Sequence, residues 1–289
     1  MAHKEKTSFL IKWIKFTVIY FLITLIVWAC YFLHNDEIDR KLVQLINPGT
    51  YIPVIDELMI LTTDFSIIVI SSIFVFWEIG FQISQIKPSL KGILANIFKM
   101  LGIASAIICL SMVYWMNYEH NDIFIFLGLA MFLGFWLMGS TYIDYGDETL
   151  KRINKVFWLS FISLILADIS VHYVKHFIFR PRPLSRLNVD WNYNLRIFPD
   201  ESVMSGSSYV SGHASALFAL LTPVFWNCRR KTGKICALGW ASLHAYSRVY
   251  VAAHFFYCTI MGSIMGFAIA TACVLAFKTS LDQGNEVYQ

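Results

Sequence analysis

The sequence predicts an all-α protein, a polytopic membrane bundle of about eight transmembrane helices. Its 289 residues are 57% hydrophobic and only 15% charged, with a mean hydropathy of +0.58. Soluble globular proteins carry roughly 25% charged residues, so this composition is typical of a chain that lies in a bilayer. Apolar runs of about 20 residues, the length that crosses ~30 Å of hydrocarbon, recur along the chain.

The first apolar run, from about residue 9 to residue 32, is longer than the core of a signal peptide, and no A-x-A cleavage site follows it. We therefore expect a retained first span. Residues 34–56 are polar and contain an amphipathic piece with Leu42, Leu45 and Ile46, which we place on the membrane surface. Further spans are expected at roughly 57–83, 93–116, 122–143, 155–177, 212–227, 235–247 and 256–277.

Basic residues are concentrated in alternate connections between the predicted spans, and loops of this kind stay on the cytoplasmic side. They are Lys87 and Lys91, then Lys151, Arg152 and Lys155, then Arg229, Arg230, Lys231 and Lys234. Both termini are then expected inside. The connections around residues 178–210 and 248–255 are expected on the outer side.

Composition and spacing argue against several other classes of protein. The net charge of +4 is explained by the basic loops and gives no reason to expect a nucleic-acid partner. None of the six cysteines forms a CxxC pair, so neither a disulfide framework nor a zinc ribbon is indicated. His172 and His176 have metal-ligand spacing, but Lys175 lies between them and would repel a cation. We expect no metal and no other cofactor, and the sequence sets no oligomeric state.

The first of three stretches with potential chemistry runs from Lys175 to Pro183. The prolines that follow Arg180 and Arg182 disfavour helical geometry in these two arginines. The chain can therefore leave the helix and turn back, so that Lys175 and Arg182 meet on one anion. Arginine binds phosphate bidentately, and lysine binds it as a point charge. The alternative is an ordinary positive loop at the membrane surface.

The second stretch, Ser211-Gly212-His213, comes directly before an apolar run. A serine before a helix is a good N-cap, and the free amides of the first turn form an anion site. Gly212 permits a close approach of the backbone, and His213 could protonate a leaving oxygen. The alternative is a capped helix with a surface histidine.

The third stretch joins Arg248 to His254 at the edge of the last apolar run. Ionisable groups in such a place are costly and usually functional. His254 could attack phosphorus and form a phosphohistidine, which divides one difficult displacement into two easier ones. Lys175, Arg182 and Arg248 would then offset the charge on the phosphate oxygens without a metal. The alternative is a lone interfacial histidine with a structural hydrogen bond.

Together the three stretches resemble the type 2 phosphatidic acid phosphatase superfamily over roughly residues 155–277. The motifs KxxxxxxRP, PSGH and SRxxxxxHxxxD here read Lys175…Arg182-Pro183, Val210-Ser211-Gly212-His213 and Ser247-Arg248…His254…Cys258. The resemblance implies a metal-independent phosphatase in an all-helical membrane core. It implies that His254 is the nucleophile, that His213 is the general acid, and that the phosphate is bound by Lys175, Arg182, Arg248, Ser211 and Gly212.

On this basis we divide the chain into three regions. Residues 1–150 are expected to hold the N-terminal transmembrane helices and the amphipathic surface segment. Residues 151–279 are expected to form the phosphatidic-acid-phosphatase-like core, and residues 280–289 a cytoplasmic tail.

Two positions depart from the motifs, because Val210 replaces a proline and Cys258 replaces the aspartate that orients the nucleophilic histidine. Neutralising the corresponding aspartate of a serine protease costs ~10⁴ in rate, and a thiol beside an apolar span is a poor substitute. An acid within a predicted span needs a partner, which makes Asp168 our candidate for a recruited acid. The alternative is a plain ion pair with Lys175 or a hydrogen bond in helix packing. Asp200 and Glu201 are weaker candidates.

The leading hypothesis is hydrolysis of a membrane lipid phosphomonoester or pyrophosphate at the outer face of the cytoplasmic membrane. In a bacterium this would be the periplasmic face of the inner membrane, with lipid A, polyprenyl pyrophosphate or a phosphoglycerolipid as the substrate. Trp191, Tyr193 and Phe198 could shape a headgroup pocket. A lipid phosphotransferase on the same scaffold is the second hypothesis. A non-catalytic lipid-phosphate-binding protein, favoured by Cys258, is the third.

Overall fold

The structure is a computed structural model that describes residues 2–47, 49–50, 52, 54–115, 122–188, 190, 195–196 and 206–277. For residues 2–10, 68, 114–115 and 122–123 it describes the backbone alone. The regular elements in these ranges are all helical, which confirms the predicted all-α class. The residues of the expected C-terminal tail lie outside the described part of the chain.

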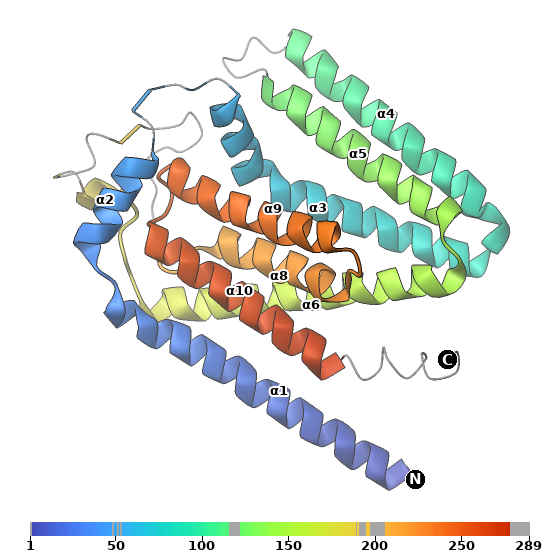
Figure 1. The fold of residues 1–289 in the computed structure, drawn as a ribbon, viewed down its shortest axis with the longest axis horizontal. Helices are drawn as coiled ribbons and strands as arrows, with labels where there is room; N and C mark the ends of the chain where they lie inside the picture. Colours follow the sequence, from blue (N-terminus) through green and yellow to red (C-terminus); the bar gives the residue numbers. More distant parts are fainter. Residues whose placement is uncertain are drawn as a thin grey trace. The chain divides into compact units, whose positions relative to one another are not determined.

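The α-helices of the described residues follow one another along the chain, and the longest connection, residues 178–211, joins α6 to α8 (Figure 1). They are α1 Ala2–Cys30, α2 Asp36–Ile46, α3 Ile55–Ile86, α4 Lys91–Trp115, α5 Asp122–Asp144, α6 Asp147–Phe177, α8 Gly212–Asn227, α9 Lys231–Tyr250 and α10 Phe256–Phe277. Short 3-10 turns occupy Tyr31–Leu33, Pro88–Leu90 and Arg186–Asn188.

Six helices of the described chain are long and apolar enough to cross a membrane, so the protein is a multi-pass membrane protein. These stretches are Ile11–Leu33, Ile55–Ile86, Pro88–Val113, Phe124–Asp144, Asp147–Phe177 and Phe256–Phe277. The predicted count of about eight is matched only roughly, because α8 and α9 do not qualify. With 16 residues α8 is about 24 Å long, short of the ~30 Å hydrocarbon core. In α9, Lys231 and Lys234 in the first turn and Arg248 in the last lower the hydropathy.

The helices divide into two compact units, and the division falls within α6, between Phe157 and Trp158. The unit of residues 51–157 contains α3, α4 and α5, with α4 and α5 side by side in Figure 1. Its core is aromatic. The Trp77 indole donates to Asn154 at 3.2 Å, and the Tyr142 hydroxyl donates to the Trp77 carbonyl at 3.0 Å.

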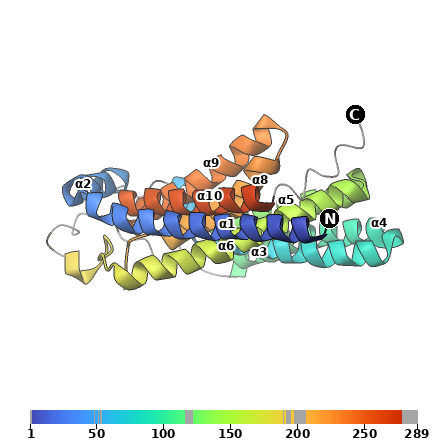
Figure 2. The same cartoon turned by 90° about the horizontal axis from the view of Figure 1, so that it is seen from below.

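The unit of residues 1–50 and 158–289 contains α1, α2, most of α6, and the trio α8, α9 and α10. Helix α1 runs along α10, as Figure 2 shows, with the rings of Trp13 and Phe277 5.5 Å apart. It is also tied to α6, because the Tyr20 hydroxyl donates to the Leu166 carbonyl at 3.2 Å.

Two glycines set the spacing between α8 and α10. A Cβ at Gly262 would lie 2.4 Å from the carbonyl oxygen of Ser211, and one at Gly266 would lie 2.1 Å from that of Ser215. Small residues on one helix face allow two backbones to approach this closely. The start of α8 is therefore held directly against the first half of α10.

Candidate active site

The three motif stretches meet at one end of the unit formed by residues 1–50 and 158–289. Lys175 is in the last turn of α6, Ser211 precedes α8, and the stretch from Arg248 to His254 joins α9 to α10. Main-chain hydrogen bonds tie them together: Ser208 N–H donates to the Arg180 carbonyl at 2.7 Å, and Ser211 N–H donates to the Cys258 carbonyl at 3.0 Å. The expected convergence of the stretches is therefore present in the fold.

The turn between α9 and α10 couples Arg248 to His254. The Arg248 carbonyl accepts hydrogen bonds from the N–H groups of Ala253 and His254, at 3.0 and 3.1 Å. Ala252 makes this turn with a φ of 55°, a left-handed conformation that costs a non-glycine residue about 1 kcal/mol. Backbone strain of this size is retained where the surrounding structure enforces it.

His254 is buried near three positively charged side chains. Its side chain is only 1% exposed. Burial is the largest cause of a pKa well below that of an ordinary histidine, and the charges of Arg182, Arg248 and Lys175 lower the pKa further. The three cations predicted to bind phosphate therefore all lie near the predicted nucleophile, which is a neutral imidazole in the ligand-free protein.

The His254 ring is oriented by Ser208. Its Nδ1 lies 2.8 Å from the Ser208 main-chain oxygen and 3.3 Å from the Ser208 hydroxyl. A carbonyl oxygen only accepts hydrogen bonds, so Nδ1 carries the ring proton and Nε2 keeps its lone pair. This is the tautomer that a histidine nucleophile requires.

His213 is at the start of α8 and keeps solvent contact. The pKa of its imidazole lies well below the usual value. The protein atoms around it remove water, and Arg248, His244, Arg182 and Lys175 add positive charge, an effect that the remaining solvent contact weakens. The same three cations thus act on both predicted catalytic histidines. His213 and the buried His244 are also stacked, with ring centroids 6.1 Å apart.

The start of α8 has the expected N-cap, because the Ser211 hydroxyl accepts from Ala214 N–H at 3.4 Å. Ser211 N–H is already used by the Cys258 carbonyl. The amides that remain to meet an anion at this helix start are those of Gly212 and His213, which have no partner among the described residues.

Cys258 lies beside Arg180 and not beside a free carboxylate. Its Sγ is 3.1 Å from Arg180 Nη1, and its thiol is hydrogen-bonded to Ser208. The Arg180 guanidinium also donates to Asp39 at 2.8 Å and to Asp36 at 2.6 Å, and it lies 4.1 Å from the centre of the Phe255 ring. Two acids of α2 thus reach the site.

Asp168, the predicted recruited acid, lies elsewhere on α6. Its carboxylate is 63% exposed and 3.6 Å from Nδ1 of His172. Among the described residues, the hydrogen-bond partner of the His254 ring is Ser208. The role of Asp168 therefore stays a prediction, and no contact with His254 among the described residues supports it. The other expected contributors, Trp191, Tyr193, Phe198, Asp200 and Glu201, lie outside the described residues.

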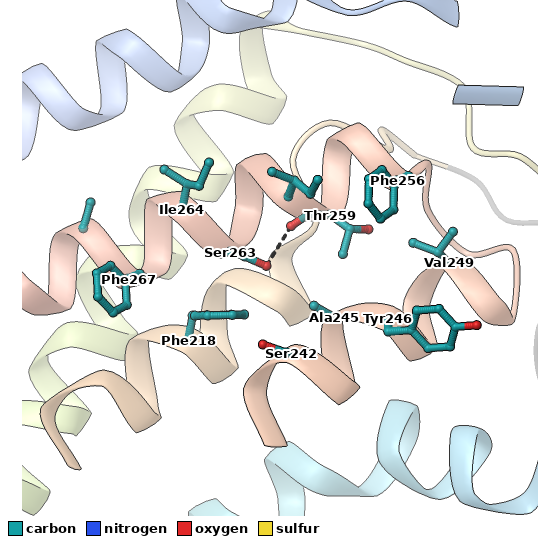
Figure 3. A pocket seen from close by; sticks show the side chains of 12 residues that line it. Phe218, Ser242, Ala245, Tyr246, Val249, Phe256, Thr259, Ser263, Ile264 and Phe267 are labelled. Carbon is teal, nitrogen blue, oxygen red and sulfur yellow. Dashed lines mark hydrogen bonds between the residues drawn. The ribbon is translucent and has the colours of Figure 1, made fainter. Parts of the chain in front are cut away.

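An apolar groove of about 440 Å³ lies between α8, α9 and α10 (Figure 3). It is lined by Phe218, Tyr246, Val249, Phe256, Thr259 and Phe267, among others. Val249, Phe256 and Thr259 are neighbours in sequence of Arg248, His254 and Cys258, but these three site residues do not line the groove.

Several residues of the site were not predicted from the sequence: Asp36, Asp39, Asn47, Arg180, Ser208 and His244. Asn47, after α2, donates to the Tyr250 carbonyl at 2.9 Å and so holds the end of α9. Asp39 and Asn47 come from a segment assigned only to the membrane surface, and Ser208 acts partly through its main chain. His244 could have been found, because it lies one helical turn before Arg248 on α9.

The family of the C-terminal part of the chain follows from comparison with known proteins. Among the described residues, no group of three His, Cys, Asp or Glu side chains is placed to hold a metal ion. Neither a curated protein nor a solved structure matched the chain. The sequence profile of the PAP2 superfamily matches residues 156–282, the stretch that carries all three motifs. Residues 156–282 therefore form a PAP2 superfamily domain within a multi-pass membrane protein, which implies a lipid phosphatase or phosphotransferase kind of activity.

Proposed function

We propose that this protein hydrolyses a phosphomonoester or pyrophosphate of a membrane lipid, through a phosphohistidine at His254. The observation that carries the proposal is electrostatic. Lys175, Arg182 and Arg248 come from separate stretches, yet all three lower the pKa of both His254 and His213. Three cations around two neutral imidazoles form a site for an anion with several negative charges.

The reaction proceeds in two displacements. In the first, His254 Nε2 attacks phosphorus, the P–O bond to the lipid breaks as the P–N bond forms, and His213 gives a proton to the leaving oxygen. In the second, His213 takes a proton from water, the water oxygen attacks phosphorus, and the P–N bond breaks to release inorganic phosphate. Lys175, Arg182 and Arg248 bind the phosphate oxygens and stabilise their charge in both steps.

The apolar groove supports a lipid as the substrate. It is lined by side chains of α8, α9 and α10 and extends along α10 from Phe256 to Phe267 (Figure 3). A hydrocarbon chain would gain binding energy in this groove, whereas a water-soluble phosphate ester would gain nothing from it. A lipid is therefore the expected substrate class, and the groove does not distinguish among lipid A, polyprenyl pyrophosphate and phosphoglycerolipids.

The distribution of basic residues supports a site on the outer side of the membrane. The connection between α8 and α9 carries Arg229 and Arg230, and Trp226 beside it donates to Thr271 near the end of α10 at 3.0 Å. Lys12 and Lys15 of α1 line a groove with residues of that same end of α10. These basic residues lie at the end of the unit opposite the site, which by the positive-inside rule supports an outer position for the site.

Purified full-length protein tests the proposal. In EDTA it should release phosphate from short-chain phosphatidic acid faster than from a water-soluble phosphomonoester, and rapid quenching with labelled substrate should trap phosphate on a histidine. His254→Ala should abolish the label and lower turnover by about 10⁴-fold or more. His176→Ala, an exposed histidine one residue after Lys175, is the matched control and should keep full activity.

Two outcomes would point to the other hypotheses. Label on His254 without release of phosphate, but with transfer to an added lipid alcohol, would show a phosphotransferase. Binding of lipid phosphates without label or release would show a non-catalytic binder. The hydrogen bond from His254 to Ser208 favours a catalytic protein, because a binder has no need of an imidazole with a defined lone pair.

A further inference from the structure

The exchange of aspartate for cysteine at position 258 leaves open how His254 is oriented. The Cys258 thiol is fully buried, and its hydrogen bonds go to Arg180 and Ser208. The ring nitrogen that an aspartate would hold is instead 2.8 Å from the Ser208 main-chain oxygen.

We propose that the Ser208 carbonyl replaces the aspartate as the group that orients His254, and that the Arg180–Asp39 ion pair holds this carbonyl in place. The inference rests on the proposed function, in which His254 is the nucleophile. Ser208, Arg180 and Asp39 are positioning residues. They set the tautomer and the direction of the imidazole and do not touch the phosphate.

The Ser208 carbonyl is held on several sides. Ser208 N–H donates to the Arg180 carbonyl at 2.7 Å, and the preceding Ser207 hydroxyl donates to the Ile178 carbonyl at 2.9 Å. On the other side, the Ser208 hydroxyl accepts from Phe255 N–H at 3.4 Å and is hydrogen-bonded to the Cys258 thiol. Ser208 is fully buried, so these bonds are not exchanged with water.

A carboxylate of α2 supplies the negative charge that an aspartate would carry at position 258. Arg180 is buried, and a buried guanidinium requires a paired charge. Asp39, itself 4% exposed, supplies this charge through Oδ2 at 2.8 Å, while its Oδ1 accepts from Tyr257 N–H at 2.9 Å at the start of α10. One carboxylate thus fixes both the arginine behind Ser208 and the helix that follows His254.

This arrangement explains why a thiol is tolerated beside Arg180. The guanidinium already contacts two carboxylates, those of Asp39 and Asp36. An aspartate at position 258 would lie where Sγ is now 3.1 Å from Nη1, and it would compete with Asp39 for the same guanidinium. Adding an acid is therefore expected to disturb the pair and not to improve the orientation of His254.

The tautomer of His254 provides a test that does not depend on turnover. Full-length protein with ¹⁵N-labelled histidine should show a neutral ring near neutral pH with the proton on Nδ1, and this signal should be missing from His254→Asn. The same tautomer should be retained in Cys258→Ser. A ring protonated on Nε2 would overturn the inference. If the tautomer is as expected but no phosphate is released, the proposed function fails and the inference about orientation stands.

Kinetics provide the second test, with a matched pair of variants on one guanidinium. Asp39→Asn keeps the shape of the side chain but removes the buried charge and one of its two accepted hydrogen bonds, and a displaced ring should lower kcat about 10- to 100-fold, with KM almost unchanged. Asp36→Asn removes the other acid, which is 58% exposed, and should lower kcat no more than about fivefold.

Equal effects of the two variants would contradict the inference. So would a gain of more than about tenfold in kcat from Cys258→Asp, because the missing carboxylate would then limit the wild type.

Discussion

At the scale of single residues, the site gathers positively charged side chains around its two histidines. His254 is buried among three cations and is neutral, and the pKa of His213 is lowered by the same cations. A general acid must carry a proton when the leaving group departs. The bound phosphate supplies the negative charge that makes protonation of His213 favourable. Substrate binding therefore converts His213 to the protonated form that can act as a general acid.

We therefore expect anion binding to be coupled to proton uptake by His213. Without a ligand, the imidazole is neutral near neutral pH because its pKa is depressed. A bound dianion raises that pKa, and we expect the complex to take a proton from the buffer. Calorimetric titration with tungstate, which has no proton to exchange near neutral pH, should give a binding heat that varies with the ionisation enthalpy of the buffer.

His213→Asn is the control for this measurement. It should bind tungstate with little or no proton uptake, while His176→Asn should behave as the wild type. Uptake that persists unchanged in His213→Asn would assign the proton to another group and remove His213 from the role of general acid.

At the scale of helices, the contact between α8 and α10 brings the second motif to the third. Because Gly262 and Gly266 have no side chain, α10 lies against the carbonyls of Ser211 and Ser215. Helix α2 acts at the same end of the unit, through Asp39 on Arg180 and Tyr257 and through Asn47 on Tyr250. The site is therefore assembled by helix contacts that lie behind the catalytic groups.

Gly266→Ala should lower both stability and activity. Its Cβ would lie 2.1 Å from a main-chain oxygen that cannot rotate away, so α8 must move and carry His213 with it. Overpacking of this kind costs about 1–3 kcal/mol. Thermal unfolding in detergent and kcat for phosphate release would measure the two effects.

Gly239→Ala in α9 is the matched control, because no atom lies within 4 Å of its added Cβ. It should leave kcat unchanged and raise stability by roughly 0.5–1 kcal/mol, through the better helix propensity of alanine. If Gly266→Ala behaved in the same way, the close contact between α8 and α10 would not be required for the site.

At the scale of the whole molecule, features set by neighbouring residues could be predicted from the sequence, whereas contacts between residues far apart in the chain could not. Long apolar runs identified the six spans, and the proline after Arg180 marked the end of α6, because both signals depend on neighbouring residues. The pairing of Arg180 with Asp39 joins residues 141 positions apart, and no local pattern reports it. The Ser208 carbonyl could not be found either, since every residue has a main-chain oxygen.

The orientation of the protein in the membrane is the last prediction. The site and the basic connection between α8 and α9 lie at opposite ends of one unit, so a reagent that cannot cross the membrane should reach only one of them. Arg186, exposed in the 3-10 turn near Arg182, marks the site end, and Cys236, exposed near the start of α9, marks the other end.

On intact cells, an impermeant maleimide should label Arg186→Cys more than the wild type. Cys236 should react only after permeabilisation, and Cys236→Ser should lose that signal. The reverse pattern would place the site on the cytoplasmic side and restrict the substrate to lipids of the inner leaflet.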